Sequence, residues 1–521
     1  MSSKWDERLG VWEIARRYPD LAAIITSTST GIVTFSQLIA RANKTVHAMR
    51  AAGVKAGDTV AIALPNDVDI VVWQLAGSQA GWRYYTLAPA LPADELSAIF
   101  AHSGAKAVVA HQANAANAAG TVGPDVRISV GGPITGFITQ EDLVEGQPES
   151  TPPQRQSGSQ LVYTSGTTGK KKAIEHPLPS LGPDDMADAM KTFGQAFGFE
   201  PLNGVHLVSA GMHHGGCRAF YEGALNVGQS LVIMAKFDAE EALSLIEQYR
   251  VSTAYMVPTQ FVRLLRLPET IRHNYDVSSL GTVVHSAAPC PREIKQQMMD
   301  WWGPVIWETY GGTEGAATIA KPQRWLERPG TVGRAIRGMR VHILDEDGND
   351  LPPHQAGMVY LEPQGQGFSY YRDEEQTAEA YRGRSFTIGD IGYLDEDGYL
   401  FIVDRKKDMI ISGGVNVYPA EVEGVLLSHP AVADAAVVGL PDPEWGETVC
   451  AYIQLADGNA ESDTLRDTLT AFAREHLDAV KCPRRMWFRD NLPRTETGKL
   501  LKRELREEMS ALLSDGSRQQ S

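Results

Sequence analysis

Residues 163–173 read Tyr-Thr-Ser-Gly-Thr-Thr-Gly-Lys-Lys-Lys-Ala and directly follow the apolar pair Leu161-Val162. Glycine lets the backbone turn its N–H groups toward an anion, hydroxyl groups donate further hydrogen bonds, and lysine supplies positive charge. The stretch therefore has the composition of a polyphosphate-binding loop. It is not a Walker P-loop, because Thr164 stands where that motif needs a glycine before Gly169-Lys170. On composition alone, an ordinary solvated surface loop is an equal alternative.

Around this loop, short β-branched apolar runs alternate with helical patterns. The runs at 59–64, 107–110 and 230–234 are typical of buried strands, and 239–249 has helical periodicity. Such alternation favours an α/β fold with largely parallel sheets. The segment 146–160, rich in Pro, Ser and Gln, is typical of a linker that leads into the loop.

The pattern changes in the last third of the chain. Short strands meet at acidic glycine turns within 341–348 and 392–399, which indicates antiparallel β structure. Further on, a helix is expected at 420–427, a strand at 435–439 and a charged helix at 500–512. These elements predict a small separate domain.

Length and charge limit the classes of protein. A chain of 521 residues exceeds the roughly 250–300 residues of a single hydrophobic core, so two or more domains are expected. The formal charge of −16 argues against nucleic acid or an anionic membrane as partner. No signal peptide and no apolar run of about 18 residues is visible, which favours a cytoplasmic protein without stable membrane insertion. The cysteines fit neither a metal site nor a disulfide framework, and are expected to be free thiols: Cys217, Cys290, Cys450 and Cys482.

Four further segments have the side chains of a nucleotide site. They are Tyr-Gly-Gly-Thr-Glu at 310–314, Ser-Phe-Thr-Ile-Gly-Asp at 385–390, the run 404–421, and Leu-Pro-Arg-Thr-Glu-Thr-Gly-Lys at 492–499. An aromatic ring such as Tyr310 can stack on a base, and a carboxylate such as Glu314 can hold Mg²⁺. Asp390 can accept hydrogen bonds from both ribose hydroxyls, and Arg405 can donate to the same sugar or to phosphate. Taken singly, each segment fits an ordinary turn or a surface ion pair equally well.

In this order and at these separations, the segments resemble the adenylate-forming superfamily of acyl-CoA synthetases, nonribosomal adenylation domains and firefly-type luciferases. The resemblance spans nearly the whole chain, from Val-Thr-Phe-Ser-Gln-Leu at 33–38 to Gly498-Lys499. It implies a large N-terminal domain, residues 1–406, with α/β subdomains and a distorted antiparallel β subdomain. A small mobile C-terminal α+β domain, residues 407–521, would follow a hinge near Lys407. The implied cofactors are ATP, Mg²⁺ and coenzyme A.

For ATP, the resemblance implies two sets of contacts. The loop would hold the β- and γ-phosphates through Thr164, Ser165, Gly166, Thr167, Thr168, Gly169 and Lys172. The other segments would provide an adenine platform at Tyr310 and Gly311, an α-phosphate contact at Thr313, a Mg²⁺ ligand at Glu314 and ribose contacts at Asp390 and Arg405. Three positions depart from the family pattern: Lys171 and Ala173 replace the usual proline and glycine, and Ile388 replaces a Thr or Ser.

Catalysis is implied for a residue of the small domain. Lys499 matches the adenylation lysine, which bridges the substrate carboxylate and the α-phosphate while pyrophosphate leaves. The small domain would then rotate about Lys407, so that the thiol of coenzyme A can reach the acyl-adenylate. In that orientation Gly413 and Gly414 would line the pantetheine tunnel. Trp445 would touch the CoA nucleotide, although a plain surface aromatic fits it equally well.

The acyl side is assigned to small residues and histidines. His213-His214-Gly215-Gly216 matches the acyl-site histidine motif, in which His214 shapes the acyl and thiol passage. The resemblance places Ala287 and Ala288 along the same site, with Ala287 where glycine is common. Gly311 and Gly312 complete the expected substrate contacts.

The choice within the superfamily depends on which charges are missing. No carboxylate occurs in 205–221 to pair with an α-ammonium group, so an amino acid substrate is not expected. No carrier-protein segment follows Lys499, which makes free CoA the simplest acceptor. Alternatives are an acyl-AMP ligase that loads a carrier protein, a luciferase-like oxygenase and a nucleotide-binding regulatory protein. The expected substrate is an apolar fatty, aryl or polycyclic steroid or terpenoid acid, and the resemblance implies a homodimer.

Overall fold

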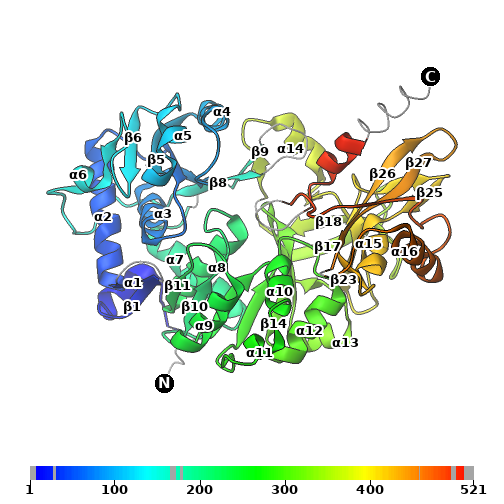
Figure 1. Cartoon of the computed structure of the whole chain (residues 1–521). Coiled ribbons are helices and arrows are strands. Elements are labelled where there is room, and N and C mark those ends of the chain that lie inside the picture. The colour runs from blue at the N-terminus through cyan, green and yellow to red at the C-terminus, as the bar shows by residue number, and fades with distance from the viewer. Residues whose placement is uncertain are drawn as a thin grey trace.

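The described part of the chain forms three β-sheets with helices packed around them (Figure 1). The computed structural model describes residues 7–26, 31–164, 172–176, 180–365, 367–456, 458–494 and 500–509. None of the helices in these ranges has the length and apolarity needed to cross a lipid bilayer.

The first sheet, drawn mainly in blue and cyan in Figure 1, has eight strands in the order β19-β9-β8-β4-β3-β5-β6-β7. Strands β4, β3, β5, β6 and β7 run parallel, and β8 and β9 form an antiparallel pair. The strands are β3 (Thr59–Ala63), β4 (Arg83–Thr86), β5 (Ala105–His111), β6 (Val126–Val130), β7 (Ile138–Thr139), β8 (Ser159–Thr164), β9 (Lys172–Glu175) and β19 (Ser369–Tyr370). The helices of this region are α2 (Phe35–Ala51), α3 (Val68–Ala80), α4 (Ala93–Ser103), η1 (Gln112–Asn114), α5 (Ala115–Ala119) and α6 (Gln140–Val144). All residues of β3 are buried, as expected for a parallel strand covered on both faces.

The second sheet is longer and changes from parallel to antiparallel along its length. Its order is β2-β1-β11-β10-β12-β13-β14-β15-β16-β23-β22-β18-β21-β20, with β17 paired to β18. The part from β1 to β14 is parallel, and the pairs from β14 onward are antiparallel. The first part contains β1 (Ala22–Thr26), β2 (Ile32–Thr34), β10 (Val205–Val208), β11 (Ser230–Ile233), β12 (Thr253–Met256), β13 (Thr282–His285) and β14 (Ile306–Gly312). The second part contains β15 (Gly315–Ala320), β16 (Gly333–Ala335), β17 (Met339–Leu344), β18 (Gly357–Pro363), β20 (Tyr381–Arg382), β21 (Ser385–Phe386), β22 (Asp390–Leu394) and β23 (Tyr399–Arg405).

Helices cover the parallel part of this sheet. They are α1 (Val11–Arg17), α7 (Pro183–Ala196), α8 (Gly215–Val227), α9 (Ala239–Tyr249), α10 (Pro258–Leu265), α11 (Glu269–Arg272), α12 (Arg292–Trp302) and α13 (Pro322–Glu327), and α14 (Glu374–Ala380) lies beside β19 and β20. Local sequence explains several boundaries. Asp238 caps α9 by accepting the N–H groups of Glu240 and Glu241, and Gly228 ends α8 with a φ of 90°.

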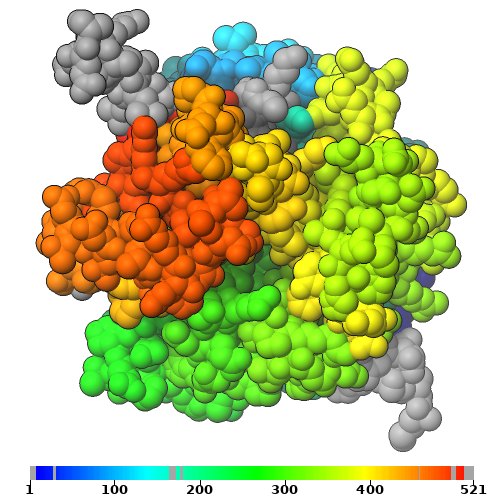
Figure 2. All heavy atoms as spheres, turned by 90° about the vertical axis from the view of Figure 1, so that its right-hand side faces the viewer, coloured from blue at the N-terminus to red at the C-terminus, as the bar shows by residue number. Residues whose placement is uncertain are grey.

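The third sheet belongs to the small domain and has the order β25-β24-β27-β26, with β28 paired to β27. Its strands are β24 (Ile410–Ser412), β25 (Val415–Val417), β26 (Val432–Asp442), β27 (Gly446–Leu455) and β28 (Arg485–Phe488), and its helices are α15 (Pro419–Leu427), α16 (Asp463–His476) and the helical residues 502–509. Figure 2 shows this domain, in orange, against the green and yellow parts of the large domain. There Arg266, which follows α10, donates to the backbone oxygen of Ala433 at 3.1 Å.

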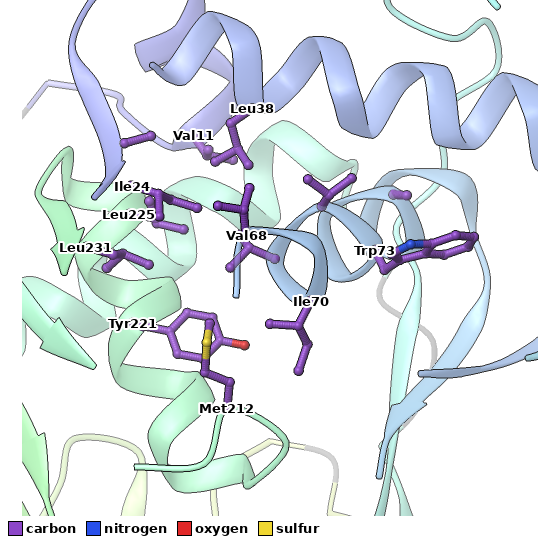
Figure 3. Packing of buried hydrophobic residues seen from close by; sticks show 14 of the residues in the cluster. Val11, Ile24, Leu38, Val68, Ile70, Trp73, Met212, Tyr221, Leu225 and Leu231 are labelled. Carbon is purple, nitrogen blue, oxygen red and sulfur yellow. The ribbon is translucent and has the colours of Figure 1, made fainter. Parts of the chain in front are cut away.

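The largest hydrophobic cluster joins the first sheet to the second. Figure 3 shows Val68 and Ile70 of α3 beside Tyr221 and Leu225 of α8, with Trp73 of α3 farther away in the same cluster. All of these side chains are buried, and burial of one such side chain stabilises the fold by about 1.5–3 kcal/mol. This core fixes α8, whose first turn lies at the candidate site.

The predicted fold class is confirmed: the structure is α/β with a large N-terminal and a small C-terminal domain. The strand expected at 435–439 is the centre of the longer β26, and the helix expected at 500–512 is helical over 502–509, with 510–512 outside the described residues. The boundary between residues 406 and 407 stays a prediction. It falls in the turn between β23 and β24.

Candidate active site

The predicted phosphate loop connects the two strands of the β8–β9 hairpin, in which Thr164 pairs with Lys172. Ser165, Gly166, Thr167, Thr168 and Gly169 lie outside the described residues, as do Lys171 and the side chain of Thr164. Their phosphate contacts therefore stay predictions. Lys172, the predicted loop lysine, begins β9 at the mouth of the hairpin.

Lys172 is connected to the predicted metal ligand by Tyr370, a residue that the sequence did not indicate. The ammonium nitrogen of Lys172 lies 5.5 Å from the centroid of the Tyr370 ring, and the Tyr370 hydroxyl donates to Oε1 of Glu314 at 3.3 Å. Burial and the neighbouring carboxylate raise the pKa of Tyr370, so this hydroxyl stays protonated as a donor. The sheet brings these groups together because β19 pairs with β9.

The predicted adenine and ribose residues meet in one hydrogen-bonded group. The Tyr310 hydroxyl donates to Oδ2 of Asp390 at 2.8 Å, and Nε of Arg405 lies 3.3 Å from Oδ1 of the same carboxylate. Asp390 and Arg405 are register partners on β22 and β23. The Asp390 side chain is 6% exposed and that of Arg405 is 37% exposed. The carboxylate is therefore buried, whereas the guanidinium reaches the surface. Burial and Asp390 raise the pKa of Tyr310.

Thr313 and Glu314 lie in the turn between β14 and β15. The Thr313 hydroxyl donates to Oε2 of Glu314 at 3.3 Å, and Nε2 of His176 lies 3.3 Å from the Thr313 backbone oxygen. A β-carbon on Gly312 would come within 2.2 Å of Oε2 of Glu314, so a larger residue here would displace this carboxylate. One carboxylate next to substrate phosphates is a typical protein contribution to a Mg²⁺ site, so Glu314 fits that role.

The histidine motif is held in place beside Thr313. His214 is the N-cap residue of α8, and a β-carbon on Gly215 would lie 3.9 Å from the Thr313 methyl group. The Thr86 hydroxyl donates to the His213 backbone oxygen at 2.8 Å. The N-terminal end of α8, with its partial positive charge, therefore lies next to the predicted α-phosphate contact.

The predicted acyl residues lie on two neighbouring elements. The Tyr255 hydroxyl is 2.9 Å from the Ser286 hydroxyl, and a β-carbon on Gly216 would be 2.5 Å from the Tyr255 oxygen, so the histidine motif and the segment after β13 are adjacent. Ala287 has a φ of 73°, a left-handed conformation that L-residues rarely adopt, and it is exposed like Gly311 and Gly312, with Ala288 half-buried beside it. This is a conformation that glycine adopts without strain.

A buried charged cluster, formed by residues of α12, β13 and β14, supports these segments and was not predicted. Nζ of Lys295 on α12 is 2.6 Å from Oε2 of Glu308 on β14, and Nε2 of His285 on β13 is 3.5 Å from the same oxygen. Burial by itself would raise the pKa of Glu308, but Lys295 and His285 outweigh it and lower this pKa to about 2. Burial lowers the pKa of His285. The available sequence signal was a lysine on the apolar face of a helix.

The predicted CoA residues form a separate group in the small domain. Gly413 and Gly414 have φ values of 58° and 79°, and a β-carbon on Gly413 would be 2.7 Å from the Trp445 ring. The Arg484 guanidinium lies over that ring, 4.0 Å from its centroid. Lys407, the predicted hinge, is exposed in the turn after β23, and Lys499 lies outside the described residues.

Known proteins resemble the chain over nearly its full length. Residues 11–371 match the AMP-binding enzyme family, and residues 421–499 match the AMP-binding enzyme C-terminal domain. A feruloyl-CoA synthase from an Amycolatopsis species is 31% identical over 512 residues, which cover 96% of this chain and 99% of that protein. The anthranilate CoA ligase AuaEII in complex with anthranoyl-AMP has a TM-score of 0.85 at 25% identity, over 98% of this chain and 100% of that one. ATP-bound MatB from Rhodopseudomonas palustris has a TM-score of 0.82 at 27% identity, over 96% and 99%.

Proposed function

Because the chain belongs to the AMP-binding enzyme family of adenylate-forming acyl-CoA ligases, we propose that it activates an apolar carboxylic acid with ATP and transfers the acyl group to CoA. In the first half-reaction the carboxylate attacks the α-phosphorus of ATP, which gives acyl-adenylate and pyrophosphate. In the second, the CoA thiolate attacks the acyl carbonyl, which gives the thioester and AMP. The Tyr310–Asp390–Arg405 group, fixed beside Glu314, is the observation that carries this proposal.

Each described residue has a role that its contacts support. Asp390 is bonded through both oxygens, yet a carboxylate has about four lone-pair sites, so it can still accept from ribose hydroxyls. Tyr310 would stack on adenine, with its ring held by the bond to Asp390. Lys172 would neutralise the leaving pyrophosphate, and Thr313 with the first turn of α8 would face the α-phosphate. A Mg²⁺ ion held by Glu314 would neutralise phosphate charge.

Lys499 and the small domain complete the reaction. Lys499 would stabilise the charge that develops on the α-phosphate as the carboxylate attacks. Rotation about Lys407 would then bring Gly413, Gly414 and Trp445 to the acyl-adenylate. His214 would border the passage through which the thiol enters.

The acid is proposed to be apolar because its side of the site has no charged residue in the histidine motif or in 286–288. Tyr255, whose hydroxyl contacts Ser286, stacks on Phe220 with ring centroids 5.0 Å apart, so buried aromatic rings support this segment. An aryl, fatty or polycyclic acid fits a site without charged residues on this side.

A panel of acids tests the proposal. Ferulic, anthranilic, palmitic and cholic acids would each be supplied with ATP and Mg²⁺, and acid-dependent ATP–pyrophosphate exchange and CoA-dependent AMP release would be measured. We expect at least one acid to support both. Exchange without acyl-CoA formation would instead indicate a ligase that loads a carrier protein, and absence of exchange with every acid would contradict the proposed chemistry.

A further inference from the structure

Lys499 belongs to a short stretch of chain whose two flanking residues are paired with each other. Arg494 and Leu500 pair as an antiparallel bridge, and the backbone N–H of Leu501 donates to the oxygen of Pro493 at 2.9 Å. Leu500 packs against a cluster that contains buried Leu492. The two residues that flank 495–499, the stretch that contains the proposed adenylation lysine Lys499, are therefore held next to each other on the small domain.

On the N-terminal side of this stretch, Arg494 forms a bidentate ion pair. Nη2 of Arg494 lies 2.7 Å from Oδ1 and 2.8 Å from Oδ2 of Asp434, and Nε lies 2.9 Å from Oδ2. Asp434 lies on β26, an edge strand of the small sheet, and its side chain is 17% exposed. A guanidinium held at both prongs is fixed in direction as well as in place.

On the C-terminal side of this stretch, Lys502 forms a second ion pair that is more deeply buried. Nζ of Lys502 lies 2.8 Å from Oε1 of Glu423 on α15, and the two side chains are 11% and 13% exposed. Glu423 is itself anchored, because its Oε1 accepts the backbone N–H of Val437 on β26 at 2.7 Å. Lys502 also begins the helical residues 502–509, which pack on the sheet through buried Leu505.

We propose that Arg494 and Lys502 are positioning residues that hold the two ends of the segment carrying Lys499, so that its ammonium group is placed for adenylate formation. Misplacement of a reacting group by about 1 Å can cost roughly a hundredfold in rate. Two anchored ends restrict a segment far more than one. The inference rests on the proposed function, because it assigns these pairs to the half-reaction that needs Lys499.

The two half-reactions separate positioning from general stability. Adenylate formation is measured by ATP–pyrophosphate exchange with the most active acid of the panel, and thioester formation by supplying CoA and the synthetic acyl-adenylate of that acid. The double variant Lys502→Met with Glu423→Gln removes both charges together but keeps an oxygen for the Val437 N–H. We expect exchange to fall by about tenfold or more while thioester formation changes by less than about twofold, since only exchange needs Lys499 in place.

Two further variants sharpen the test. Lys502→Arg keeps the charge pair and is expected to retain most of the exchange activity. Arg494→Lys keeps the charge but loses the two-pronged geometry, and is expected to reduce exchange by about threefold to tenfold without affecting thioester formation.

A comparable pair in the same domain serves as the matched control. Lys481 contacts Glu421, also on α15, at 2.9 Å. Lys481→Met is expected to leave both half-reactions unchanged. If the Lys502 double variant lost both half-reactions equally, or lost no exchange activity, the inference would be overturned. The proposed function would still stand in that case, provided that the wild-type protein is active. A wild-type protein inactive in both half-reactions would overturn the proposed function and the inference together.

Discussion

Tyr370 shows how one side chain connects two parts of a site that lie far apart in the sequence. Its hydroxyl donates to Glu314, and its ring lies under the ammonium group of Lys172. Both contacts exist because β19 pairs with β9 and so brings residue 370 to the mouth of the hairpin. The side chain thus couples the position of the predicted metal ligand to that of the loop lysine.

Replacing Tyr370 with phenylalanine tests this coupling, because it deletes the hydroxyl and keeps the ring. A hydrogen bond to a charged group is worth about 1.5–3 kcal/mol, and at 3.3 Å we expect the lower part of that range. The Mg²⁺ concentration for half-maximal ATP binding, measured by calorimetry, should rise by about tenfold. Tyr371→Phe is the control, since that hydroxyl donates to the Ser103 backbone oxygen instead. An unchanged Mg²⁺ requirement in Tyr370→Phe would contradict the coupling.

Ala287 carries backbone strain that glycine would relieve. Its φ of 73° costs an L-residue about 1–2 kcal/mol, whereas glycine adds about 0.4–1 kcal/mol of chain entropy to the unfolded state. Ala287→Gly should therefore increase the free energy of unfolding by roughly 0–1.6 kcal/mol in urea denaturation. The neighbouring substitution Ala288→Gly should decrease it. A clear loss of stability in Ala287→Gly would show that its methyl group packs usefully.

At the scale of elements, three segments meet at the Lys295–Glu308–His285 cluster. α12 supplies the lysine, β14 the glutamate and β13 the histidine, and His285 and Glu308 are register partners. Each strand continues into the site, β13 into Ala287 and β14 into Tyr310. The cluster therefore fixes the carboxyl ends of two adjacent strands at the point where the predicted substrate contacts begin.

The ion pair should be costly to break and much less costly to remove. Lys295→Met leaves the Glu308 carboxylate buried without its cation, and should lower the free energy of unfolding by about 3–5 kcal/mol. The double variant Lys295→Met with Glu308→Gln removes both charges and should recover more than half of that loss in the same urea titration. Equal losses in the single and double variants would show that the charge pair is not the source of the effect.

The lowered pKa of Glu308 leads us to expect that the free energy of unfolding depends on pH in the acid range. Its pKa is lowered from 4.5 to about 2 in the folded protein, so the contribution is complete above pH 4.5 and is lost as pH falls toward 2. A shift of that size corresponds to about 3 kcal/mol at most. The free energy of unfolding should therefore fall less steeply between pH 4.5 and 3 in Glu308→Gln than in the wild type. Identical pH profiles would mean that Glu308 has an ordinary pKa in the folded chain.

Elements were predictable where a local pattern sufficed. The helix 239–249 matches α9 because both its apolar period and its Asp238 cap are local. The strand at 435–439 was predicted too short, because only its apolar centre is visible in sequence, whereas pairing with β27 extends it over Val432–Asp442. Helix α16 was not predicted, although Ser462 caps its N-terminus.

At the scale of the whole molecule, the motifs gave the residues of the candidate site but not their support. Tyr310, Asp390 and Arg405 meet because β14, β22 and β23 belong to one sheet. The motifs name these residues but do not show that their strands share a sheet. Tyr370 and the Lys295 cluster depend on pairings between distant strands and on burial, which no local pattern of this chain reveals. The contacts that hold the site therefore required the structure.

The relation between the two domains leads to a prediction at Lys407. Lys406 donates to Gly389 at 2.9 Å, and the N–H of Asp408 donates to the Arg405 oxygen at 3.0 Å, which closes a turn with Lys406 and Lys407 at its centre. Rotation of the small domain about Lys407 would have to open this turn, and proline fixes one backbone angle of residue 407 at about −65°. Lys407→Pro should hold the domains in one orientation, so that pyrophosphate exchange and thioester formation from acyl-adenylate change by factors that differ by about tenfold or more. Lys407→Ala removes the side chain without restricting the backbone and should affect both half-reactions alike. If proline also affected both alike, the turn would not be the axis of rotation, and the domains would have to alternate about another segment.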